Sequence, residues 1–220
     1  MNTSIAGTQS RSGAIAGFVS VLLMISGVVF VASLNLPYES PAVVLLSEIE
    51  GKRESLGAGV FLFALAGVVF LWFLGTLHGV LRRAERGTGS LSSVAFEAGS
   101  LWAFLWILYA AMVTSSFELI GEFYNDPQAA KAALGIGWNV LVGPIVFLLP
   151  IVLLAATAVL SIRAQALPRW LGWTSAALAG VLVVGSALGA AFGGLALATG
   201  VLFQLWVLVT SGVLLRARPS

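Results

Sequence analysis

The stretch LGAGVFLFALAGVVFLWFLGTL, Leu56–Leu77, holds 22 consecutive residues without an ionisable side chain and is followed at once by HGVLRRAER, residues 78–86. About 20 apolar residues in a helix are enough to cross the hydrocarbon core of a bilayer. Because lipid offers no hydrogen-bond partners, such a segment has to satisfy its own backbone polar groups, and a helix does so. The stretch therefore predicts a transmembrane helix with a basic end.

Five further long apolar stretches surround this one. The chain is 59% hydrophobic and only 9% charged, whereas soluble domains contain roughly 25% charged residues. We therefore expect an all-α integral membrane protein: a single domain over residues 1–220, built as a six-transmembrane-helix bundle. The first stretch is longer than the roughly 7–15 residues of a signal-peptide h-region, so we expect it to stay uncleaved. The approximate predicted spans are 13–34, 56–77, 94–119, 138–161, 170–190 and 195–215.

The basic residues predict how these spans are oriented. Lysine and arginine concentrate in the cytoplasmic loops of membrane proteins. With six spans, eight of the eleven basic residues fall on the side of the two termini and three on the other. This predicts a plasma-membrane protein with both termini in the cytoplasm. The eight are Arg11, Arg82, Arg83, Arg86, Arg163, Arg169, Arg216 and Arg218, and the three are Lys52, Arg53 and Lys131.

Two loops on the predicted outer side are long enough to hold a short helix. In the first, Ser40-Pro41 precedes the segment 42–50, and in the second Asn125-Asp126-Pro127 precedes 128–134. A polar cap residue followed by proline is a helix start signal. We expect short helices on the outer surface in both loops. The first is either a lid over an outward-facing cavity or a helix lying among the lipid headgroups.

The composition removes several kinds of chemistry. The chain has no cysteine and only one histidine, so thiolate, haem and histidine-rich metal sites lack ligands. We expect no cofactor and no metal. The positive net charge sits at helix ends, which indicates contact with membrane lipids instead of nucleic acid.

Acidic residues on the third predicted span are the first candidates for function. At 100° per residue, Glu97 and Glu122 lie close to one line along the helix, and Glu118 lies about 60° from it. One interpretation is an ion or proton path along this face. The other is that the carboxylates lie near the interfaces and pair with neighbours, with Glu97 close to His78 and the Arg82-Arg83 pair.

Three other polar residues have two interpretations each. His78, at the end of the second span, is either a proton acceptor or an interfacial residue favoured by the helix dipole. Gln204, in the middle of the sixth span, either contacts a ligand or forms an interhelical hydrogen bond. Asn139 lies on the fourth span with Pro144 and Pro150, and this span either lines a cavity or is simply kinked.

Aromatic residues and glycines point to packing. Trp102, Trp106 and Tyr109 form a stripe opposite the acidic face of the third span, which favours packing over an aromatic ligand cage. Glycines spaced by four residues allow close helix contacts. They predict tight packing of the fifth span, in the bundle or in a homo-oligomer. These glycines are Gly185, Gly189 and Gly193, with the pairs Gly13–Gly17 and Gly75–Gly79 elsewhere.

Three short segments resemble sequences that recur in uncharacterised actinobacterial multi-span membrane proteins: FLWFLGTL at 70–77, GSLSSVAF at 89–96 and ALPRWLGW at 166–173. The resemblance implies a bacterial plasma-membrane protein of a domain-of-unknown-function type. It implies no activity, cofactor or catalytic residue.

Because the polar residues are few and peripheral, we expect a non-enzymatic module that binds a lipid or another hydrophobic ligand, or an accessory subunit of a partner membrane protein. One alternative is a small-solute, ion or proton transporter or channel that uses Glu97, Glu118 and Glu122. The other is an intramembrane enzyme with His78 and Glu97 as its acid–base pair. No catalytic residue is assigned.

Overall fold

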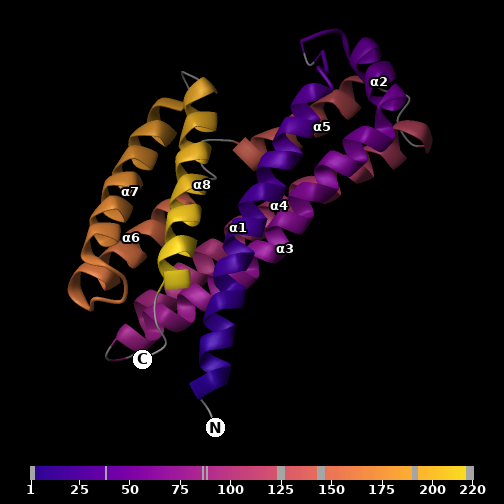
Figure 1. Cartoon of the computed structure of the whole chain (residues 1–220). Coiled ribbons are helices and arrows are strands. Elements are labelled where there is room, and N and C mark those ends of the chain that lie inside the picture. Colours follow the sequence, from indigo (N-terminus) through magenta and orange to yellow (C-terminus); the bar gives the residue numbers. More distant parts are fainter. Residues whose placement is uncertain are drawn as a thin grey trace.

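The computed structural model describes residues 3–37, 39–85, 87, 89–122, 127–142, 147–189 and 193–216. These residues form eight helices and no strand (Figure 1). The expectation of an all-α architecture is confirmed for this part of the chain. The helices are α1 (Thr3–Ser33), α2 (Ala42–Gly51), α3 (Arg53–Ala84), α4 (Ser90–Glu122), α5 (Pro127–Val142), α6 (Leu148–Arg163), α7 (Arg169–Gly189) and α8 (Gly193–Arg216).

Five of these helices are long and apolar enough to cross a membrane, and they contain five of the six predicted spans. This is consistent with an α-helical membrane protein. Helices α1, α3 and α4 extend beyond their predicted spans because flanking polar residues, such as Arg82 and Arg83 on α3, continue the same helix. The five apolar segments are Arg11–Ser33, Arg53–Ala84, Ser90–Ser115, Arg169–Leu188 and Ala198–Arg216.

The fourth predicted span, 138–161, falls on two helices instead of one. Helix α5 begins at Pro127, where the sequence predicts a helix start, but it runs past the predicted surface helix to Val142. Helix α6 then begins at Leu148 and has 16 residues. In the sequence Gly143 and Pro144 lie between the two helices, and proline cannot donate a backbone hydrogen bond inside a helix. Pro150 is tolerated in α6 because it lies in the first turn.

The helices pack as a closed ring. Helix α1 packs on α3, α3 on α4, α4 on α6, α6 on α7 and α7 on α8, and α8 returns to pack on α1. Figure 1 shows α1 beginning and α8 ending at the same end of the molecule. At the other end lie α2 and α5, which contact each other.

Two lysines tie α2 and α5 to the chain segment that follows α1. Lys131 Nζ of α5 donates a hydrogen bond of 2.7 Å to the carbonyl of Ser40. Lys52 Nζ donates one of 2.9 Å to the carbonyl of Leu34 and pairs with Glu48 Oε2 at 2.9 Å. A cation on the carbonyl end of α1 complements the helix dipole. Helix α2 is present where the sequence predicts it, with Leu45 and Ile49 buried.

Glycines allow close helix contacts at several of the predicted positions. A Cβ on Gly13 would meet Thr76 of α3, and one on Gly17 would meet Ser211 of α8. A Cβ on Gly185 would lie 2.5 Å from Thr199 Cγ2 of α8, so the predicted tight contact of the fifth span is confirmed within the bundle. Gly75 has open space around it and serves no such contact.

Candidate functional site

Helix α4 has one exposed and one buried face, as its sequence period predicts. Glu97 is exposed, and Phe104 on the same face is 54% exposed. On the opposite face Trp102, Trp106 and Tyr109 are 3%, 0% and 4% exposed. The carboxylate face is thus outside the bundle, and the aromatic stripe is part of the core.

The buried stripe belongs to a larger group of rings, here called the aromatic cluster. Its rings come from α3, α4, α8 and the residue before α6, and neighbouring centroids are 5.5–6.3 Å apart. This spacing is the usual range for stacked and edge-to-face aromatic pairs. The cluster joins helices from opposite sides of the ring. Its members are Phe70, Phe73, Trp102, Trp106, Phe147, Phe203 and Trp206.

The tryptophans of the aromatic cluster lie at mid-length of α4 and α8. Trp102 is near the middle of the apolar segment Ser90–Ser115, and Trp206 is near the middle of Ala198–Arg216. Tryptophan in membrane proteins gathers at the interfaces, where its ring is apolar and its N–H is wet. Two adjacent tryptophans at mid-length of one helix therefore need a reason other than interfacial anchoring.

The three tryptophans of the cluster differ in their hydrogen bonding. Trp206 Nε1 donates a bond of 2.8 Å to Ser175 Oγ of α7. The indole N–H groups of Trp102 and Trp106 are buried and have no acceptor among the described residues. An unpaired buried polar group costs about 1–3 kcal/mol. The ring centroids of Trp102 and Trp106 are 5.8 Å apart. An acceptor atom placed near both indoles would therefore be stabilised.

An unpaired acceptor lies on the neighbouring helix. Gln204 is partly buried on α8, and its buried Oε1 accepts no hydrogen bond from the part of the chain that the structure describes. Gly200, one turn earlier, faces the ring of Phe147, since a Cβ there would lie 3.9 Å from Phe147 Cζ. Residues four apart share a helix face, so Gln204 lies on the face directed toward Phe147. Phe147 in turn packs on Trp102 with 5.6 Å between centroids.

The interruption of the fourth span is next to these groups. Phe147 immediately precedes the first residue of α6. The first turn of a helix carries backbone N–H groups without intrahelical partners and the positive end of the dipole. Indole donors, an amide acceptor and a helix start thus converge between α4, α6 and α8. The chemistry on offer between these helices is two hydrogen-bond donors and one acceptor.

The predicted acidic site is not assembled in the described residues. Glu97 forms no hydrogen bond or ion pair there, and none joins it to His78, Arg82 or Arg83. Glu118 and Glu122 belong to α4 and Asn139 belongs to α5. The side chains of these last three residues lie outside the described part of the structure.

His78 takes part in a different arrangement, in the turn between α3 and α4. Its Nδ1 lies 3.0 Å from the carbonyl oxygen of Ser92, and because a carbonyl only accepts, Nδ1 carries the proton. The imidazole also packs on Phe96, with 5.2 Å between centroids. Glu85, which the sequence analysis did not single out, accepts 2.9 Å bonds from the backbone N–H groups of Leu91 and Ser92. Its carboxylate therefore caps the first turn of α4.

The cap lowers the pKa of Glu85. Desolvation opposes ionisation of this carboxyl group, but the hydrogen bonds from Ser92 and Leu91, together with the nearby His78, outweigh it and hold the pKa below the usual value. Glu85 is thus an anion at neutral pH, and it stabilises the positive end of α4. The turn is a structural joint between two long helices.

In the described part of the chain, no group of three or more histidine or acidic side chains could hold a metal ion. Comparisons of the chain with protein families, with curated proteins and with solved structures found no match in any of the three. The partial resemblance to actinobacterial membrane proteins therefore leads to no further conclusion about this chain. Its function has to be argued from the site itself.

Proposed function

We propose that this chain is a six-span protein of the bacterial plasma membrane whose helix bundle binds a small apolar molecule bearing hydrogen-bond acceptors. The observation that carries this proposal is the pair of buried, unpaired indole N–H groups of Trp102 and Trp106. Aromatic rings and a few well-placed polar groups are the usual lining of a small-molecule site. A carbonyl, ester or ether oxygen on a flat or lipid-like molecule would pair with these donors.

The sixth crossing in this proposal is α6. Its 16 residues extend about 24 Å at 1.5 Å per residue, and α5 precedes it on the same predicted span. If α6 is counted as a crossing, both ends of the chain lie on the same side of the membrane. That side holds eight basic residues and the other side three, which favours a cytoplasmic location for the two termini.

A second candidate is a small-solute transporter. The observation that favours it is that the apolar stretch 138–161 belongs to two helices, α5 and α6, because transporters often bind their substrates at discontinuous transmembrane helices. In this version the same molecule passes through the bundle instead of remaining bound. A path along Glu97 would need a second copy or a partner subunit to cover that exposed face. The enzyme alternative gains no support, since His78 bonds to Ser92 and not to Glu97.

Native mass spectrometry of the protein released from a mild detergent tests the proposal. We expect the wild type to carry a bound molecule of defined mass. Trp102→Phe and Trp106→Phe, which keep a ring but remove the donor, are expected to lose most of it. Trp206→Phe is the matched control, because its donor is already satisfied by Ser175. A wild type without bound mass would mean that water alone pairs with the indoles and would contradict the proposal.

A further inference from the structure

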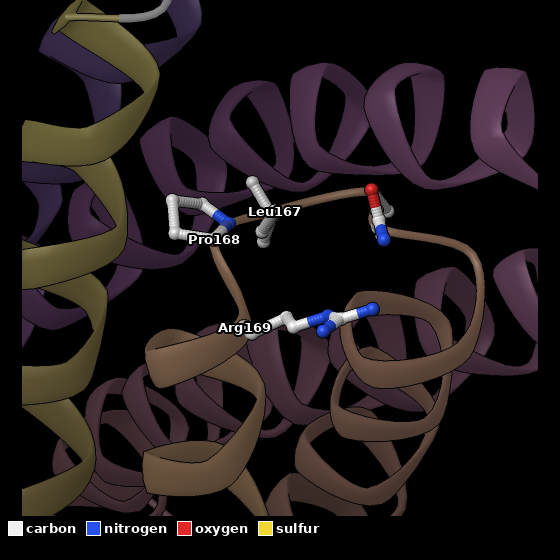
Figure 2. A pocket seen from close by; sticks show the side chains of 5 residues that line it. Leu167, Pro168 and Arg169 are labelled. Atoms are coloured by element: carbon white, nitrogen blue, oxygen red, sulfur yellow. The ribbon is translucent and has the colours of Figure 1, made fainter.

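The loop between α6 and α7 borders an open surface cavity of about 340 Å³, lined by residues 165–169. Figure 2 shows the side chain of Arg169 extending across the space beneath this loop, with Leu167 and Pro168 on the opposite side. Arg169 also begins α7, so the cavity adjoins the first turn of a 21-residue helix. The α6–α7 loop lies at the end of the molecule where α1 begins and α8 ends (Figure 1).

The loop keeps a defined shape. The backbone N–H groups of Ala164 and Ala166 both donate to the carbonyl of Leu160, at 3.0 and 3.3 Å. Gln165 between them has a φ of 54°, the left-handed conformation that commonly ends a helix. Leu167 is 6% exposed and anchors the loop in the core. The cavity is thus formed by ordered backbone.

The positive charge around the cavity has no acidic residue near it in the sequence. Arg163 and Arg169 are both exposed, and neither has an ion-pair partner in the described residues. Residues 127–220 contain no aspartate or glutamate at all. The arginines of the α3–α4 turn, in contrast, have Glu85 in the same turn. The anion that balances Arg163 and Arg169 therefore has to come from outside this half of the protein.

Two exposed tryptophans indicate the depth in the membrane at which such an anion would lie. Trp170 is 52% exposed and Trp173 is 65% exposed, within one turn of the cavity. Exposed tryptophan beside arginine at the end of a spanning helix is typical of the lipid headgroup region. A guanidinium group binds phosphate with two parallel hydrogen bonds, and the start of α7 adds the positive end of a helix dipole.

We propose that the α6–α7 loop is a binding site for the phosphate of an anionic phospholipid. Arg169 and Arg163 bind the phosphate oxygens, Gln165 contacts the headgroup, and Trp170 and Trp173 pack beside the glycerol region. The cytoplasmic leaflet supplies such lipids. The lipid site rests on the proposed orientation but shares no residue with the aromatic cluster, so a failure of one binding site leaves the other intact.

The test is native mass spectrometry of the full chain after exchange into mixed micelles with phosphatidylglycerol or phosphatidylcholine. We expect phosphatidylglycerol to be retained preferentially by the wild type, and roughly tenfold more weakly by Arg169→Gln and Arg163→Gln, as the loss of a charge-assisted hydrogen bond implies. Arg169→Lys, which keeps the charge, is expected to recover part of the binding. Arg82→Gln is the matched control at the same end of the bundle.

Three outcomes would overturn the proposal. Equal retention of the two lipids would remove the preference for an anion. An equal loss in Arg82→Gln would show a diffuse basic surface instead of a site. Displacement of the lipid by millimolar inorganic phosphate would show that free phosphate, and not the lipid headgroup, is the ligand. Thermal unfolding of each variant in phosphatidylcholine alone separates loss of binding from loss of folding.

Discussion

Trp206 on α8 donates its indole N–H to Ser175 Oγ on α7 at 2.8 Å, and Ser175 in turn donates to the carbonyl of Leu171 at 2.7 Å. The two side chains are 5% and 0% exposed, so this bond joins adjacent helices inside the core. It also shows what the aromatic cluster looks like when an indole donor is satisfied. Trp102 and Trp106, in the same cluster, lack such a partner within the described ranges.

Ser175→Ala is expected to destabilise the protein by about 1 kcal/mol, because it leaves the Trp206 donor unpaired. Ser186→Ala on the same helix is the control. The Ser186 hydroxyl is buried without a partner, so its removal should leave stability unchanged or raise it. Unfolding by denaturant in micelles of fixed composition measures both. If both variants lost the same free energy of unfolding, the Trp206–Ser175 hydrogen bond would not contribute to stability as proposed.

Gly67→Ala is expected to destabilise the α3–α4 pair by about 1–3 kcal/mol, the usual range for overpacking. A Cβ at Gly67 would lie 2.8 Å from the backbone oxygen of Ala103, which cannot move without shifting α4. Gly75→Ala on the same helix meets open space and should stabilise by up to about 1 kcal/mol through helix propensity. Thermal unfolding of the two variants in one detergent is the measurement. A neutral Gly67→Ala would contradict the close approach of α3 and α4.

Stability is expected to fall with acid through Glu85. Its pKa in the folded protein is below the usual value of 4.5. The stabilisation is therefore complete above about pH 4.5 and is lost as the pH falls further, through the folded pKa. Glu85→Gln should be less stable than wild type at pH 7, and the difference should shrink at lower pH. Melting curves of both proteins against pH give the answer. If the difference in stability between the two proteins stayed constant with pH, the cap would not depend on ionisation of Glu85.

The orientation can be tested by cysteine labelling, because the chain contains no native cysteine. Glu39→Cys lies in the α1–α2 connection and Gln165→Cys in the α6–α7 loop, and both positions are exposed. A membrane-impermeant maleimide added to intact cells should label position 39 and should label position 165 only after lysis. The reverse pattern would place the termini outside the cell.

Much of the architecture follows from one-dimensional patterns. A run without charge such as Leu56–Leu77 has to form a helix in lipid, and 100° periodicity alone places Glu97 opposite Trp102 and Trp106. The helix start at Pro127 also follows from its cap signal. These features depend only on neighbours in the sequence, so no knowledge of the packing is required.

Tertiary contacts decide the rest. The cap on α4 forms because Glu85 reaches the backbone N–H of Ser92 across a turn. In the sequence, the only indication of this cap is a carboxylate that comes just before the glycines preceding the helix. The meeting of Phe203 on α8 with Trp102 on α4 joins residues a hundred positions apart. A signal for the site was present all the same: tryptophan in the middle of a span, far from its preferred depth, is a residue that needs a partner.

The most direct test of the proposed site is NMR of the indole N–H groups in protein labelled with ¹⁵N-tryptophan, assigned by single tryptophan-to-phenylalanine variants. As purified in mild detergent, the signals of Trp102, Trp106 and Trp206 are all expected to indicate hydrogen bonding. Extraction of bound lipids and small molecules should shift the first two and leave Trp206, which Ser175 holds, unchanged. Three signals that do not respond to extraction, or two indoles that are unbonded throughout, would contradict a ligand in the bundle.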